Sequence, residues 1–187
     1  AAGFLLVFFF AAFFGAARFT VFFAVVRFAT FFVAVFFRAY NFPSNPPALD
    51  WDEVSMGYNA YSILETGRDE FGKLLPLYFR SLDDNKLPLY TYITVGSIFL
   101  FGFNDFAVRF PSLLFGVATV ILLYFLTLEL TKSRAVSCLA GLFIAILPWH
   151  VQFSRMALEA NVGLFFYTLG ILSFLYALRN RSYFFVV

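Results

Sequence analysis

Long apolar runs alternate with short polar stretches along most of the chain. A helix needs about 20 mostly apolar residues to cross a membrane, because each residue rises about 1.5 Å and the hydrocarbon core is about 30 Å thick. Runs close to this length occupy residues 19–38, 111–130, 135–153 and 162–178. The pattern therefore predicts an all-α integral membrane protein with about four transmembrane helices.

Residues 41–106 form the longest stretch that is not continuously apolar. A proline-rich turn opens this stretch, and a short helix is expected from Asp50 until Gly67. The apolar segment 87–101 is only about fifteen residues long, which is short for a span, and Pro88 suits the first position of a helix. We therefore expect an outer loop with short interfacial helices that do not cross the membrane.

The first forty residues are apolar and rich in Phe, and the only charges among them are Arg18, Arg27 and Arg38. This length exceeds that of a secretory signal peptide. Two arrangements stay open for this region. Either it forms one long helix, or a separate segment at 1–18 precedes the span at 19–38.

Composition agrees with a membrane protein. Hydrophobic residues make up 62% of the chain and charged residues 13%, whereas an ordinary soluble domain has roughly 25% charged residues. The lipid bilayer is therefore an expected partner. The net charge of +2 and the lack of a basic stripe argue against nucleic-acid binding. Cys138 is the single cysteine and lies in an apolar run, so it can form neither an internal disulfide nor a cysteine-rich zinc site.

The placement of charge predicts a topology, since cytoplasmic loops are enriched in Lys and Arg. Five basic residues that flank predicted spans can be placed together on the cytoplasmic side, namely Arg18, Lys132, Arg134, Arg179 and Arg181. The loop at 41–106 and the segment 154–161 then both lie outside, provided that 87–101 does not cross. The acidic loop and Glu159 would then face the same compartment.

Asp52 and Glu53 are candidate catalytic residues at the start of the expected loop helix. A carboxylate at the membrane surface can act as a general base on an acceptor hydroxyl, and a helix N-terminus favours its ionised form. The alternative is structural, because Asp50 followed three residues later by Glu53 has the spacing of a capping box. Asp52 is the acid that capping does not need.

Lys86, with Arg80, is a candidate for binding a lipid phosphate, since Lys86 lies just before a predicted interfacial helix. Interfacial anchoring by long cationic side chains is the alternative. Asp83 and Asp84 could bind a divalent cation, although solvated loop acids need no such role. No cofactor is certain from the sequence, and a divalent metal stays an open alternative.

Arg155 and Glu159 form a second candidate site near the end of the predicted span at 135–153. Four residues apart on one helix, they would face the same side and could pair. Such charges beside apolar runs indicate a cavity or a structural ion pair. His150 follows Trp149, and an interfacial position is expected for both side chains.

The order of several short motifs resembles the GT-C membrane glycosyltransferases, in particular the group of dolichyl-phosphate-mannose protein mannosyltransferases and aminoarabinose transferases. The resemblance covers about residues 37–180. It rests on Asp50-Trp51-Asp52-Glu53, Gly57-Tyr58-Asn59-Ala60-Tyr61, Thr66-Gly67-Arg68-Asp69, Lys86-Leu87-Pro88-Leu89-Tyr90, Val108-Arg109-Phe110-Pro111-Ser112 and Ser154-Arg155-Met156-Ala157-Leu158-Glu159.

This resemblance implies an inverting sugar transfer from a polyprenyl-phosphate donor to a glycan, lipid or protein acceptor on the non-cytoplasmic face. Asp52 matches the essential loop acid of the family, with Glu53 beside it, and Lys86 matches a lysine near the lipid phosphate. Glu159 matches a second acid, which is often Asp in related enzymes, and Leu87 replaces a proline.

Family members are much longer, so the chain resembles their N-terminal portion. The plasma membrane of a prokaryote is the expected location. The competing hypothesis is a non-catalytic membrane module, such as a transporter segment or an assembly partner.

Overall fold

The computed structural model describes residues 2–42, 44–81 and 84–180. Asp83, a candidate cation ligand, and Arg181, a basic residue of the predicted topology, lie outside these residues. The side chains of Arg18 and Asp84 are likewise not described. The described residues form seven α-helices and two short β-strands. This architecture confirms the predicted all-α class.

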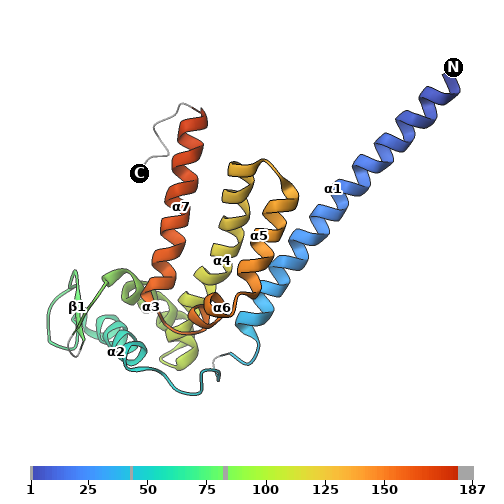
Figure 1. Cartoon of the computed structure of the whole chain (residues 1–187). Coiled ribbons are helices and arrows are strands. Elements are labelled where there is room, and N and C mark those ends of the chain that lie inside the picture. The colour runs from blue at the N-terminus through green and yellow to red at the C-terminus, as the bar shows by residue number, and fades with distance from the viewer. Residues whose placement is uncertain (1, 43, 82–83, 181–187) are drawn as a thin grey trace.

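The helices of the bundle are α1 (Ala2–Ala39), α4 (Asp105–Thr131), α5 (Arg134–Ile146), α6 (Pro148–Arg155) and α7 (Glu159–Asn180) (Figure 1). Three stretches are long and apolar enough to cross a membrane: Val21–Ala39, Asp105–Thr131 and Glu159–Arg179. The pair α5 and α6 passes the same test together but is bent by 56°. Helix α1 is continuous, so one long helix, rather than a separate N-terminal segment, precedes the loop.

The bend replaces the single straight helix that the apolar run at 135–153 predicts. Pro148 has no backbone N–H, and Leu147 before it adopts an extended conformation with φ −61° and ψ 116°. Carbonyl groups at the end of α5 therefore lose their helical partners, which is costly in a membrane. The fully buried Arg38 supplies donors, with Nη1 3.0 Å from Ala145 O and Nη2 3.2 Å from Ile144 O.

His150 belongs to the same cluster, which corrects its expected interfacial position. Its Nδ1 lies 2.7 Å from Arg38 Nη2, and the side chain is buried, whereas Trp149 is exposed. Since the guanidinium can only donate, Nδ1 accepts and the ring proton is placed on Nε2. His150 therefore helps to hold α6 against the end of α1.

The outer loop folds against one end of the bundle. Helices α2 (Trp51–Thr66) and α3 (Pro88–Phe101) lie at the end of the bundle where α1 ends and α4 begins, here called the loop end (Figure 1). Strands β1 (Phe79–Ser81) and β2 (Asp84–Lys86) form an antiparallel hairpin between them. With 14 residues, α3 is too short to cross a bilayer.

The opposite end of the bundle carries basic residues and is here called the basic end. Arg179 Nη1 lies 3.0 Å from Glu129 Oε2, and Lys132 pairs with the same carboxylate. This contact brings the end of α7 beside the end of α4. The described basic residues Lys132, Arg134 and Arg179 therefore lie at the end away from the loop (Figure 1).

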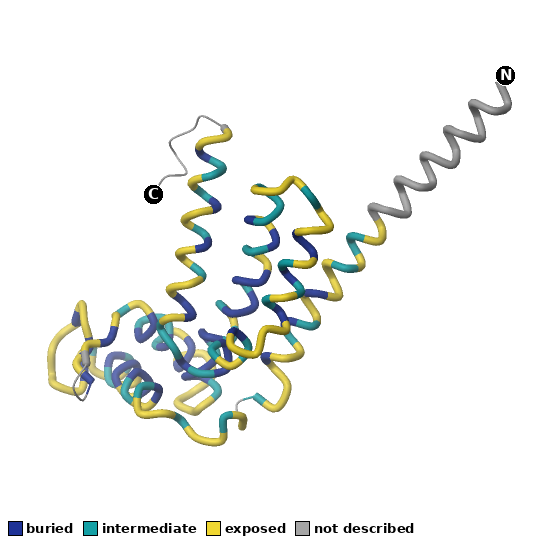
Figure 2. Tube along the Cα trace, in the orientation of Figure 1, coloured by how far each residue is buried: buried dark blue, intermediate teal, exposed yellow. Residues whose placement is uncertain are grey.

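A buried apolar cluster attaches the loop helices to the spans. It contains Met56, Tyr90, Val108, Ala157 and Val162, which come from α2, α3, α4, the α6–α7 linker and α7. Figure 2 shows the same distribution, with buried positions concentrated where the loop helices meet α4. Burial raises the pKa of the Tyr90 phenol well above its ordinary value. Its neutral O–H donates to Val108 O at 2.9 Å.

Close packing of α4 on α6 gives a first prediction. A Cβ atom at Gly116 would lie 2.5 Å from the Cβ of the fully buried Ser154. We expect Gly116→Ala to destabilise the protein by about 1–3 kcal/mol, the usual cost of overpacking, measured by thermal unfolding in detergent. Gly163→Ala is the matched control, since nothing beyond its own stretch of helix backbone lies within 4 Å of the added methyl group. Equal stability of the two variants would contradict this packing.

Candidate active site

Asp52 and Lys86 form an ion pair at the loop end of the bundle. Asp52 Oδ1 lies 3.0 Å from Lys86 Nζ. The aspartate is in the first turn of α2, and the lysine is the last residue of β2. The Asp52 side chain is 41% exposed, whereas that of Lys86 is 9% exposed. The carboxylate of the pair is therefore open to solvent while the protein surrounds most of the lysine.

Glu159 joins this group from the far end of the sequence. Its Oε2 accepts a hydrogen bond of 2.8 Å from the backbone N–H of Leu87, the residue after Lys86. As the first residue of α7, Glu159 also places a negative charge where a helix favours it. The structure thus brings Asp52, Lys86 and Glu159 together, on three different elements.

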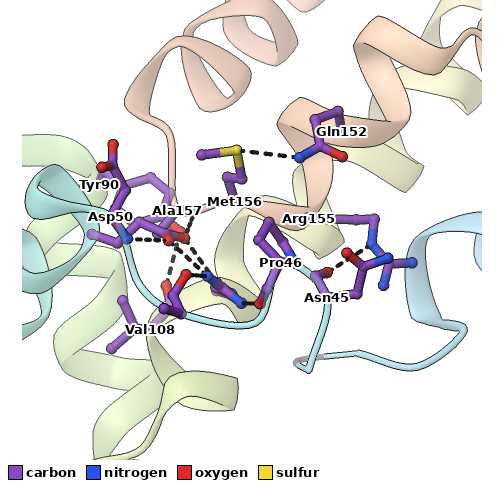
Figure 3. Close-up of polar contacts among 12 residues, drawn as sticks. Asn45, Pro46, Asp50, Tyr90, Val108, Gln152, Arg155, Met156 and Ala157 are labelled. Carbon is purple, nitrogen blue, oxygen red and sulfur yellow. Dashed lines mark hydrogen bonds and ion pairs between the residues drawn. The ribbon is translucent and has the colours of Figure 1, made fainter.

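Glu53 lies next to Asp52 in sequence but occupies a different environment. It is fully buried, and its Oε2 accepts from Asp50 N at 2.9 Å, which completes a capping box. Arg109 donates Nε to Oε1 at 2.9 Å and Nη2 to Oε2 at 2.8 Å. Ala157 N donates to Oε1 at 2.6 Å. Figure 3 shows these contacts converging between Asp50 and Ala157.

Four donors therefore occupy the Glu53 carboxylate inside the protein. A carboxylate that already accepts this many hydrogen bonds, and is closed to solvent, cannot accept a substrate proton without losing them. We therefore propose that Glu53 positions the site and does not contact substrate. Glu53 therefore has the capping role that its spacing from Asp50 allowed. Asp52 is the exposed carboxylate of this helix turn.

Arg109 is the residue that sequence reasoning missed, apart from its place in a short motif. It is 1% exposed and also donates to Pro46 O at 2.8 Å and Ala48 O at 2.7 Å. One side chain therefore connects α4, the proline-rich turn and the start of α2. A charge directly before the apolar run 111–130 was the available signal, since a charge so close to a span needs a partner.

Arg155 supports the loop rather than pairing with Glu159. It is buried and donates to Phe37 O at 2.9 Å and to Asn45 O at 3.0 Å, the second contact being visible in Figure 3. The expected pair required one helix through both residues. Instead α6 ends at Arg155 and α7 begins at Glu159, so the i,i+4 geometry does not arise between these two described residues.

The structure does not bring Arg80 to Lys86. In the hairpin Phe79 is opposite Lys86, and Arg80 is opposite Asn85. Successive side chains of a strand point to opposite faces, so Arg80 and Lys86 lie on different faces of the hairpin. Arg80 is exposed, with its guanidinium carbon 5.9 Å from the centroid of the Phe71 ring.

A match to a known protein family identifies the kind of protein to which this site belongs. The family model for dolichyl-phosphate-mannose-protein mannosyltransferase matches residues 25–185. This chain belongs to that family. The match includes the loop end and every candidate residue described above. No curated protein and no solved structure matches the chain.

Membership makes the chain a membrane-embedded member of a glycosyltransferase family, as the resemblance implied. In this mannosyltransferase-family chain the Asp52–Lys86 pair and Glu159 form the candidate active site, supported from behind by the Glu53–Arg109 pair. Among the residues that the structure describes, no group of three His, Cys, Asp or Glu side chains could hold a metal ion.

Proposed function

We propose that this protein transfers a sugar from a polyprenyl-phosphate donor to an acceptor hydroxyl on the non-cytoplasmic face of the membrane. The family name supports a lipid-phosphate donor and a mannosyl transfer. The observation that carries the proposal is the 3.0 Å pair between Asp52 and Lys86 at the loop end. It provides one group that can accept a proton and one that can bind a phosphate, held together on separate elements.

The reaction needs both groups. The acceptor oxygen attacks the anomeric carbon while Asp52 takes its proton as general base. The bond between the anomeric carbon and the phosphate oxygen breaks, and the phosphate leaves with the polyprenyl chain. Lys86 balances the charge that grows on this leaving group. Attack opposite the leaving phosphate inverts the configuration of the anomeric carbon.

The ion pair also suggests how the site responds to its donor. A lipid phosphate competes with Asp52 for Lys86 Nζ, because both are anions that accept from the ammonium group. Donor binding therefore frees the Asp52 carboxylate for the acceptor. Glu159 keeps Lys86 in place through its hydrogen bond to Leu87 N.

The loop end is proposed to face the outside, because the basic end carries Lys132, Arg134 and Arg179, which favour the cytoplasm. A prokaryotic plasma membrane is the proposed location. The acceptor is a glycan, lipid or protein with a free hydroxyl.

Lys86→Gln gives the direct test of donor recognition. Loss of a charge-assisted contact to phosphate costs about 1.5–3 kcal/mol, so donor affinity should fall about 10- to 100-fold. It is measured from the thermal stabilisation of the complete protein by a polyprenyl-phosphate sugar. Lys86→Arg keeps the charge and should keep part of the affinity. Lys73→Gln is the matched control, since Lys73 is an exposed loop lysine over the Tyr78 ring.

The same titration separates the proposal from a transporter segment or an assembly module. A non-catalytic module predicts no stabilisation by the polyprenyl-phosphate sugar and no difference between the Lys86→Gln and Lys73→Gln variants. Either result would remove Lys86 from donor binding.

A further inference from the structure

A hollow of about 490 Å³ lies between α1, α4 and α5, in the half of the bundle away from the candidate active site. Residues on its wall include Arg27, Phe28, Phe31, Ile121, Tyr124 and Cys138. Figure 1 shows these three helices running side by side at this level. The volume lies within the range of small-molecule sites, roughly 300–1,000 Å³, and most of the wall surface is apolar.

The wall residues are ordered along the axes of the helices that carry them. Cys138 lies four residues into α5, about 6 Å from the basic end, and Tyr124 lies about 10 Å from the end of α4. Phe31 is one turn further along α1 than Arg27, and Ile121 is about one turn before Tyr124, so both lie deeper. The hollow therefore has its cation nearer the basic end and its apolar side chains toward the middle of the bilayer.

Arg27 is the charged group of this hollow. It is exposed, and its guanidinium carbon lies 5.8 Å from the centroid of the Tyr124 ring. Within the described part of the chain no carboxylate pairs with it, and Glu129, near the end of α4, is already paired with Lys132 and Arg179. A charge within the apolar span Val21–Ala39 calls for an anionic partner.

We infer that this hollow binds an anionic phospholipid of the leaflet at the basic end. The phosphate pairs with Arg27, and an acyl chain lies against Phe28, Phe31 and Ile121. Lipid headgroups are recognised in this way by basic pockets between transmembrane helices. The order of the wall, with the cation near the surface and the apolar groups deeper, matches the order of groups in such a lipid.

The short axial extent favours a lipid over a protein helix. On α1 the wall runs from Arg27 to Phe31, about 6 Å, and on α4 from Val120 to Phe125, about 8 Å. A transmembrane helix would pack along most of the roughly 30 Å hydrocarbon thickness. A local hollow beside a single cation fits one lipid segment instead.

Phosphatidylglycerol and phosphatidylcholine, compared by native mass spectrometry of the complete protein, test this site. We expect phosphatidylglycerol to bind more tightly, and Arg27→Gln to weaken it about tenfold or more, as for loss of a charge-assisted contact. Ile121→Trp fills the hollow while keeping the cation, and should also abolish binding. Arg27→Lys keeps the charge and should retain the preference for the anionic lipid.

Arg134→Gln is the matched control, because Arg134 is an exposed arginine at the basic end and outside the wall. Binding should survive this change. An equal loss with Arg134→Gln would indicate diffuse surface charge and overturn the site. Equal binding of the two lipids, or phosphatidylglycerol binding that persists in Ile121→Trp, would also overturn it. The site would also be overturned if a protein segment that crosslinks to Cys138 prevented lipid binding.

Discussion

Replacing Asp52 with Asn is expected to lower sugar transfer about 10²- to 10⁴-fold, the usual contribution of a general base. Asn has the shape of Asp but no carboxylate to accept the acceptor proton. The Asp52 side chain is 41% exposed, so the change should have little effect on folding. The rate is measured as transfer from a polyprenyl-phosphate sugar in membranes that contain equal amounts of protein.

The ion pair also predicts how the loss of activity divides between kcat and the KM for the donor. Asp52 competes with the donor phosphate for Lys86, since its Oδ1 lies 3.0 Å from Nζ. Removing the carboxylate charge should therefore lower kcat without raising the KM for the donor. A merely structural role for Asp52 would instead weaken donor binding together with the rate.

Asp50→Asn is the control for Asp52→Asn. Asp50 is the N-cap of the same helix, and Asn serves equally well at that position. Its transfer rate should stay near that of the parent protein. Full activity of Asp52→Asn, or an equal loss in both variants, would remove Asp52 from the reaction.

Glu53→Gln is expected to destabilise the protein by about 3–5 kcal/mol, the cost of removing one partner from a buried ion pair. The fully buried carboxylate faces Arg109, which is 1% exposed. A neutral amide leaves the Arg109 charge uncompensated and turns an N–H group toward its donors. The free energy of unfolding is measured by denaturant titration in detergent.

Glu65→Gln is the matched control, because Glu65 is an exposed glutamate of the same helix. Its effect should stay within about 0.5 kcal/mol, as for most surface substitutions. Arg109→Met should cost about as much as Glu53→Gln, since both break the same pair. A small effect of Glu53→Gln, close to that of Glu65→Gln, would show that the pair does not hold the loop to the bundle.

Three buried arginines have a common task in this fold. Arg38 binds carbonyls at the bend between α5 and α6, Arg109 binds those of the proline-rich turn, and Arg155 binds those where α1 ends. At each of these three places, backbone carbonyl groups lack a helical hydrogen-bond partner. Irregular backbone beside a membrane must find donors in the protein, and a guanidinium supplies five.

Local patterns predicted much of this fold. The apolar runs predicted the long apolar helices, and the short segment before Gly102 predicted the short helix α3, since both properties depend on neighbouring residues only. The motif order identified the family. Capping logic also separated Asp52 from Glu53, because a capping box is built from residues close in sequence.

Contacts between distant segments could not be predicted in this way. Glu53 and Arg109 are 56 positions apart, and nothing local pairs them. The break between the end of α6 at Arg155 and the start of α7 at Glu159 kept these two residues from pairing, and the pleat of the hairpin turned Arg80 away from Lys86. The sequence by itself determined the membrane class, the spans and the candidate acids, because these follow from composition and local periodicity. Only the tertiary structure decided which charges meet, because burial stabilises a charge only beside a partner that the whole fold supplies.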